Sequence, residues 1–201
     1  ASYFAERFGG EKEDYDVLQH RGGTVDGNRD AWNEMMAVVN FGLESELAYQ
    51  FVQQYVDVPS LIDYALINFY CANIDWDHNN WFGGRKREPC AQFQFLTCDG
   101  ERTFRTVDFD GTQVDNPNQP THIHQQLTGN AEYRLLFADH VHRHFFNGGV
   151  LTPAAAERRW LDRAHEIALP MWAEAASWGD DQRAEQTYSP ALDWLAELER
   201  V

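Results

Sequence analysis

The chain of 201 residues is 43% hydrophobic, which is enough to form the buried core of one domain or of two small lobes. Its 32 acidic and 16 basic residues give a net charge of −16, and this charge opposes binding to nucleic acid or to anionic lipid. No apolar stretch approaches the ~20 residues that a membrane helix needs, so we do not expect membrane insertion either.

The first half of the chain predicts one short strand and several helices. "SYFAERFGG" is typical of a helix end that stops at glycine, residues 14–18 alternate like a strand, and "VDGN" at 25–28 predicts a turn. Helices are then expected at three places: 30–41; 44–55, where Leu47, Phe51 and Tyr55 recur every fourth residue; and 59–72, which starts at a proline. The third is apolar nearly all round, so we expect a buried central helix.

The second half predicts one β-hairpin and further helices. Residues 79–87 and 91–97 have a strand-like pattern, with a proline in the short connection between them. Residues 105–120 are rich in Gly, Pro, Asp and Asn and predict a loop, and helical patterns occupy most of the chain from Thr121 onward. The predicted fold is therefore mainly α with a small β-hairpin, an α+β class.

The polar stretch "NIDWDHNNW" at 73–81 directly follows the buried helix and precedes the hairpin. Protein kinases have the same order of parts, because their H-R-D-x-x-x-x-N segment is followed by a hairpin and then by D-F-G. Asp75 and Asn80 have the five-residue spacing of the kinase Asp and Asn, and Asp99 with Gly100 follows the hairpin. The pattern therefore indicates a phosphotransfer site, although a simple helix cap and turn would also use Asn and Asp here.

The chemistry of phosphoryl transfer explains these residue types. A carboxylate at Asp75 would orient the attacking hydroxyl and accept its proton, which makes Asp75 the candidate catalytic residue. Mg²⁺, or Mn²⁺ in its place, prefers hard oxygen ligands, so Asn80 and Asp99 are the candidate metal ligands. Further polar side chains of the same two segments are possible supporting residues: Asp77, Asn79 and Glu101.

Three blocks of the chain, "LIDYALINFYCANIDWDHNNW", "FQFLTCDGERTF" and "LLFADHVHRHFFNGG", resemble the CotH kinase family, spore-coat and cell-surface proteins with an atypical kinase-like fold. The likeness covers most of the chain and is strongest in the N-x-DW-x-x-NNW block. It implies a secreted or surface-associated protein kinase that uses Mg²⁺ and ATP and that acts on surface or coat proteins. It matches the two aspartates of the family with Asp75 and Asp99.

The nucleotide-binding part of a kinase is missing from the pattern. The glycine pairs at 9–10, 22–23, 83–84 and 148–149 stand alone, so they form no Gly-rich phosphate loop. We therefore expect residues 1–201 to be a single domain that resembles a kinase C-lobe, with the N-lobe upstream of Ala1. No residue is assigned to the nucleotide.

Two other functions stay open. Without an N-lobe, the chain would be a kinase-like binding or surface-structural module that has no catalytic activity. A metal hydrolase is the minor alternative, because His140 and His144 lie one helical turn apart, as in zinc-binding helices, and His122 with His124 would complete a site. No Glu follows His140 in the H-E-x-x-H arrangement that would favour this alternative.

Overall fold

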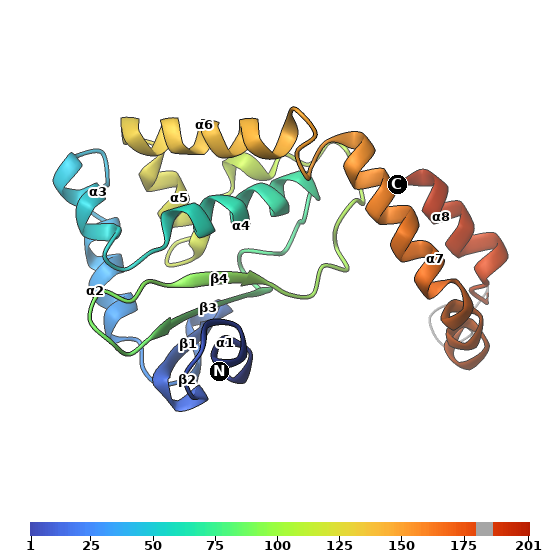
Figure 1. Cartoon of the computed structure of the whole chain (residues 1–201), viewed down its shortest axis with the longest axis horizontal. Helices are drawn as coiled ribbons and strands as arrows, with labels where there is room; N and C mark the ends of the chain where they lie inside the picture. The colour runs from blue at the N-terminus through green and yellow to red at the C-terminus, as the bar shows by residue number, and fades with distance from the viewer. Residues whose placement is uncertain (180–186) are drawn as a thin grey trace. The chain divides into compact units, whose positions relative to one another are not determined.

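The computed structural model describes residues 1–179 and 187–201, which form two compact units, Ala1–His142 and Arg143–Val201 (Figure 1). The first unit contains the four strands and most of the helices. The second consists of the end of one helix and the helices that follow it. The expectation of a single kinase-like lobe stays a prediction.

The elements confirm a mainly α fold with a small antiparallel sheet. The helices of the first unit are α1 Ser2–Phe8, α2 Asp30–Val39, α3 Glu46–Val52, α4 Val58–Tyr70, α5 Pro120–Leu127 and α6 Ala131–Phe145, the last of which continues into the second unit. Its strands are β1 Tyr15–Gln19, β2 Gly23–Asp26, β3 Trp81–Lys86 and β4 Gln94–Thr97, and its 3₁₀ turns are η1 Lys12–Asp14, η2 His20–Gly22 and η3 Gly111–Gln113. The second unit adds α7 Pro153–Trp178, the π-helical turn η4 Pro190–Trp194 and α8 Leu195–Arg200.

The predicted hairpin is one half of a four-stranded antiparallel sheet with the order β2-β1-β3-β4. β3 and β4 are the expected hairpin, and β1 lies where the alternation at 14–18 predicted a strand. The sequence does not predict β2, because its four residues show no apolar alternation and the last two of them belong to the predicted turn at 25–28. Gly22 (φ 76°) makes the tight connection from β1 to β2 that a side chain would strain.

Helix α4 is the buried central helix that the sequence predicts. Its N-cap residue, Asp57, accepts a hydrogen bond from the backbone N–H of Ser60 at 3.0 Å, and Pro59 occupies the first turn. Leu61 and Ile62 are fully buried. Figure 1 shows α4 running between the sheet and α6, and it packs on both β4 and α5. The end of α4 therefore places the polar stretch that follows it at one end of the sheet.

Helix α3 is shorter than the helix predicted at 44–55, and the fourfold repeat of Leu47, Phe51 and Tyr55 does not mark its buried face. Leu47 is 80% exposed, whereas Tyr49 and Val52 are the buried residues. Tyr49 and Val52 lie three residues apart, which also places them on one face of a helix. Because α3 has only about two turns, the fourfold repeat that the sequence offers cannot select the face that packs against α2.

An aromatic cluster fixes the hairpin to α2. Trp81, the first residue of β3, stacks on Trp32 of α2 with ring centroids 5.4 Å apart. Phe93 and Phe95 pack edge-on against the same Trp32 ring. Rings of this size dominate the energy of a core, so the start of β3, and with it Asn80, has a well-defined position.

In the second unit, α7 begins at Pro153 immediately after its N-cap residue, Thr152. It is joined to α8 by a hydrogen bond from the indole N–H of Trp160 to the backbone oxygen of Leu198, at 3.3 Å. Trp172 and Trp178 are more than half exposed. This unit buries few of its large apolar side chains within itself.

Candidate active site

A ladder of buried amides connects α4 to the polar loop, residues 73–80. Asn68 donates from Nδ2 to the backbone oxygen of Tyr64 at 2.8 Å, and Asn73 donates from Nδ2 to Oδ1 of Asn68 at 3.0 Å. Oδ1 of Asn73 then lies 3.4 Å from the backbone nitrogen of Asp75. Satisfied buried networks of this kind are rigid. The last turn of α4 thus sets the position of Asp75.

Asp77 holds the other side of the polar loop to α5. Its carboxylate is buried and accepts hydrogen bonds from the backbone N–H of Thr121 (2.9 Å), the hydroxyl of Thr121 (2.5 Å) and Nδ2 of Asn116 (2.8 Å). Burial raises the pKa of Asp77, and the three hydrogen bonds oppose that rise. Both carboxylate oxygens are therefore already bonded within the protein.

Asp75 is also buried, but its carboxylate lacks the hydrogen bonds that Asp77 has. Only 5% of the residue is exposed, and Oδ1 is buried without a hydrogen-bond partner among the described residues. Oδ2 lies 3.8 Å from Nε of Arg102, which is too long for a hydrogen bond. A buried carboxylate oxygen without a donor costs free energy and is uncommon in folded proteins. The orphaned oxygen marks Asp75 as a residue suited to an external ligand.

The hairpin register brings Asn80 and Asp99 together. Trp81 pairs with Thr97, so the residue before β3 and the residues after β4 lie at the same end of the sheet. Nδ2 of Asn80 donates to the backbone oxygen of Asp99 at 3.2 Å. Asp99 itself adopts a left-handed backbone (φ 51°), which Asp tolerates better than most residues and which turns the chain sharply after β4.

Glu101 belongs to the same group of oxygen ligands. A hydrogen bond with the Asp99 side chain raises the pKa of Glu101, and the negative charges of Asp99 and Asp75 raise it further. Such mutual repulsion is relieved when a cation binds. Four of the predicted side chains are therefore gathered at one end of the hairpin: Asp75, Asn80, Asp99 and Glu101.

The donor set fits a hard divalent cation, since it consists of carboxylates and a side-chain amide. Asp75, Asp99 and Glu101 do not all lie within 4.8 Å of one another, however. Asp99 and Glu101 are exposed, whereas Asp75 is buried. Binding an ion would accordingly need rotation of the two exposed side chains toward the orphaned oxygen of Asp75.

Two arginines near this site were not predicted. Nη2 of Arg21, in the turn between β1 and β2, donates to Oδ1 of Asn79 at 2.6 Å, and Arg102 lies beside Asp75. Asn79 therefore contacts the β1–β2 turn. Arg102 follows directly after Glu101 in "CDGER", so its proximity to the acidic residues was visible, but the fold of the turn that aims it at Asp75 was not.

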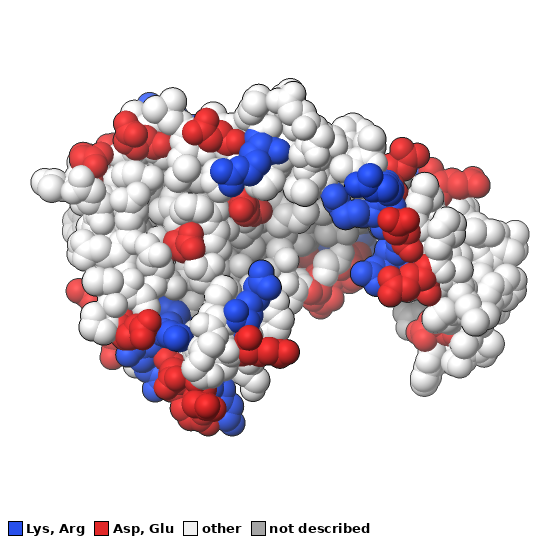
Figure 2. Space-filling model, viewed as in Figure 1, with Lys and Arg blue, Asp and Glu red and all other residues white. Residues whose placement is uncertain are grey.

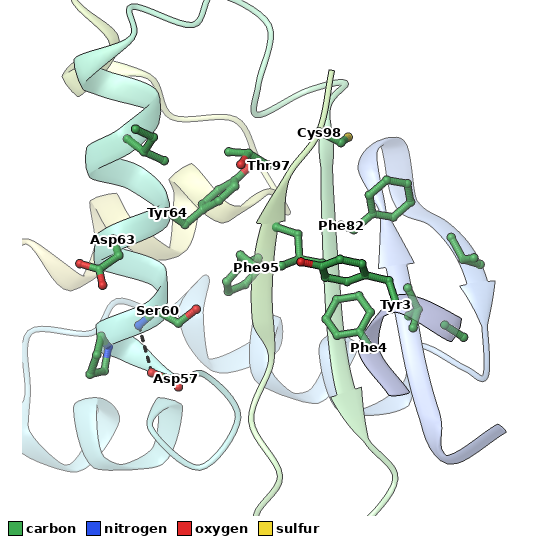
Figure 3. Close-up of a pocket in the computed structure, with 16 residues that line it drawn as sticks. Tyr3, Phe4, Asp57, Ser60, Asp63, Tyr64, Phe82, Phe95, Thr97 and Cys98 are labelled. Carbon is green, nitrogen blue, oxygen red and sulfur yellow. Dashed lines mark hydrogen bonds between the residues drawn. The ribbon is translucent and has the colours of Figure 1, made fainter. Parts of the chain in front are cut away.

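A large groove opens beside β4 (Figure 3). Its volume is 960 Å³, and it lies between α4, the sheet and the start of α1. Tyr64 of α4 and Phe95 lie on one face of the sheet and Phe82 and Phe4 on the other, so the groove runs around the edge strand β4. The groove ends at Cys98, the residue before Asp99, so its mouth adjoins the gathered oxygen ligands.

The histidines have partners within the fold. Nδ1 of His140, on α6, lies 2.6 Å from Oδ1 of Asp63 on α4, and His144 follows one turn later on the same helix. His122 contacts Asp115 and Asn40, whereas the buried His124 contacts the hydroxyl of Tyr133. Among the described residues, Asp63, His140 and His144 offer ligand atoms that all lie within 4.8 Å of one another, but no group with such spacing includes His122 or His124. The four-histidine site of the hydrolase alternative is not formed.

Comparisons with family models, with curated proteins and with solved structures found nothing that matches this chain. None of its described helices combines the length and the apolar character needed to cross a bilayer. On the face shown in Figure 2, small groups of basic side chains alternate with acidic ones, the pattern of a solvated protein surface.

Proposed function

We propose that this chain carries the hydroxyl- and metal-binding part of a CotH-like protein kinase, which transfers the γ-phosphate of ATP to Ser or Thr hydroxyls of surface or coat proteins. The observation that supports it most is the buried carboxylate of Asp75, whose Oδ1 has no partner, at the end of the hairpin where Asn80 meets Asp99. A carboxylate that only stabilised the fold would be expected to have its donors, as Asp77 does.

In this proposal Asp75 orients the acceptor hydroxyl and takes its proton as the oxygen attacks the γ-phosphorus. Asn80 and Asp99 hold the metal, with Glu101 in support, and a bound Mg²⁺ would neutralise the charge that develops on the phosphoryl oxygens. Asp77 and Asn79 act indirectly, because their hydrogen bonds hold the polar loop in place.

In this proposal the groove of Figure 3 holds the nucleotide. Its aromatic and aliphatic lining suits a purine base, and its end at Cys98 would direct the phosphates toward Asp99. An N-lobe would cover this groove from the open side. The protein substrate and the location outside the cell or on its surface follow from the resemblance to the CotH family alone.

A kinase-like binding module without catalytic activity is the second candidate. The separation of the carboxylates of Asp75, Asp99 and Glu101 favours it, since a preformed metal site would hold them closer. The two candidates differ in whether the site transfers phosphate once ATP and metal are present.

The test uses the full-length natural protein, labelled ATP and Mg²⁺. Asp99→Asn should abolish transfer and weaken metal-dependent ATP binding together, because it removes a charged ligand without changing shape. Asp75→Asn should leave ATP binding nearly intact and lower transfer by about 10²-fold or more, the scale of general-base effects. Asp108→Asn, an exposed acid in the following loop, is the matched control.

Transfer by the natural protein that depends on Asp99 and Asp75 but not on Asp108 supports the kinase. If the Asp75 and Asp108 variants behave alike, Asp75 is not the base. ATP binding without any transfer in the natural protein would replace the kinase by the binding module.

A further inference from the structure

Arg102 is the one basic side chain that the described structure pairs with a proposed catalytic or metal-binding carboxylate. Its Nε lies 3.8 Å from Oδ2 of Asp75, so the two side chains interact through charge and not through a hydrogen bond. The Asp75 side chain is only 7% exposed, whereas that of Arg102 is 45% exposed. The carboxylate is therefore fixed and the guanidinium has room to move.

The backbone that carries Arg102 is well held. Thr103 donates to the backbone oxygen of Gly100 from its N–H at 3.2 Å and from its hydroxyl at 2.8 Å, which closes a tight turn around residues 100–103. Phe104 donates from its N–H to the backbone oxygen of Cys71 at 2.7 Å. This turn is thus tied to the end of α4, directly before the polar loop, while the Arg102 side chain extends from it toward Asp75.

We propose that Arg102 is a catalytic residue of this site: it balances the charge of Asp75 when the site is empty, and in the complex its guanidinium turns to the phosphoryl group that is transferred. The inference rests on the proposed function. During transfer the bond from the γ-phosphorus to the ADP oxygen breaks, the bond to the acceptor oxygen forms, and the acceptor proton goes to Asp75. Arg102 keeps its own proton throughout, because a guanidinium does not deprotonate in proteins.

The chemistry of the site calls for such a cation. Asp75, Asp99 and Glu101 give the end of the hairpin a strongly negative potential, which by itself repels a triphosphate. A guanidinium offers several N–H donors in one plane and matches the geometry of phosphate oxygens. Positive charge next to the transferred phosphoryl group is a general requirement for catalysing its transfer.

A purely structural ion pair is a poor explanation of the contact. An ion pair that forms no hydrogen bond and whose arginine is 45% exposed contributes little to stability, and it leaves Oδ1 of Asp75 without a donor. Both observations fit a side chain that pairs with Asp75 only until a ligand arrives. Since Arg102 and a metal ion would compete for the same negative charge, removing Arg102 should strengthen metal binding while it weakens transfer.

The experiment compares Arg102→Ala and Arg102→Lys with Arg105→Ala, which removes the same charge from an exposed position three residues further along the chain. Two quantities are measured on the full-length natural protein: the affinity for Mn²⁺ without nucleotide, and the rate of transfer from labelled ATP. Arg102→Ala should bind Mn²⁺ about 3- to 10-fold more tightly, because a nearby positive charge is gone. Its rate of transfer should fall by about 10²-fold or more, and the rate of Arg102→Lys should lie between those of the natural protein and of Arg102→Ala.

The outcomes separate this inference from the proposed function. Natural protein that neither binds Mn²⁺ nor transfers phosphate rules out the proposed function and, with it, the role of Arg102. Natural protein that does both, with Arg102→Ala indistinguishable from Arg105→Ala, overturns the role of Arg102 alone. Weaker Mn²⁺ binding together with a lower melting temperature in Arg102→Ala would show a structural role and would also overturn it.

Discussion

The two ends of the polar loop show how differently two buried aspartates can be used. At the end anchored to α5, three donors surround Asp77, and two of them come from a residue 44 positions away in the chain. At the end that follows α4, Asp75 has an orphaned oxygen and a distant arginine. The first arrangement stabilises the fold, whereas the second is costly to the fold and available to a ligand.

The same substitution at both positions tests this contrast, and Asp77→Asn should have the largest effect. An amide must place its NH₂ group against one of the donors of Thr121 or Asn116, so a buried donor loses its acceptor. We expect the free energy of unfolding in urea to fall by about 3–4 kcal/mol. A loss below about 1 kcal/mol would mean that the hydrogen bonds of Asp77 contribute little to stability.

The stability of the fold should also depend on pH, because His124 of α5, the helix that anchors Asp77, is buried. Burial lowers the pKa of His124 to about 4, so the folded protein keeps this ring neutral while the unfolded chain protonates it near pH 6.5. Between these two values the unfolded state binds more protons, and stability contributed by the neutral ring is lost as the pH falls. The loss should reach about 3 kcal/mol at pH 4.

Urea unfolding of the natural protein and of His124→Gln at pH 7, 6, 5 and 4 measures this term. The variant is expected to be less stable at pH 7, since Gln cannot replace the ring contacts of His124 with Phe69 and Phe137. It should nevertheless lose less stability than the natural protein on acidification. Parallel curves for the two proteins would show that His124 does not titrate in this way.

Binding of a metal ion near Asp75 and Asp99 gives a third test of this contrast. If Mg²⁺ binds the folded protein at a concentration ten times its Kd, it should stabilise the fold by about 1.4 kcal/mol through mass action. For a protein of this size the melting temperature would rise by about 3–5 °C. Asp99→Asn should remove the shift and Asp108→Asn should keep it, whereas equal shifts in both variants would place the ion elsewhere.

The smallest effect is expected for Asp75→Asn. Removing a buried charge that has no donor on one oxygen relieves a cost, while the contact with the partly exposed Arg102, which is too long for a hydrogen bond, contributes little. The free energy of unfolding should therefore stay within about 1 kcal/mol of the natural value or rise. A loss as large as that of Asp77→Asn would show that the two ends of the loop do not differ.

The sequence predicts the fold best where local patterns and packing agree. The apolar circumference of α4, the alternation at β1 and the strand-like runs at β3 and β4 each predict one element, and the structure has those elements. β2 and the buried face of α3 were not predictable, because the residues of β2, Gly-Thr-Val-Asp, show no apolar alternation and two helical turns offer more than one stripe.

The candidate site likewise has features that the sequence predicts and features that it does not. Asp75, Asn80 and Asp99 could be chosen from spacing and order along the chain, and the register of one hairpin is enough to bring Asn80 to Asp99. The separate tasks of Asp77 and Asp75 could not be predicted, since both are Asp residues of the same loop. Their difference depends on Thr121 and Arg102, which reach them only through the tertiary fold.

The central pair of the sheet has a consequence for how the protein is made. β1 pairs along its whole length with β3, and Arg87 just beyond β3 bonds to the backbone oxygen of Tyr15, 72 positions earlier. Closing such a long loop costs chain entropy before any contact repays it, so this pairing forms late. On the ribosome, β1 must wait until β3 has left the exit tunnel, and until then its edges are open to pairing with other chains.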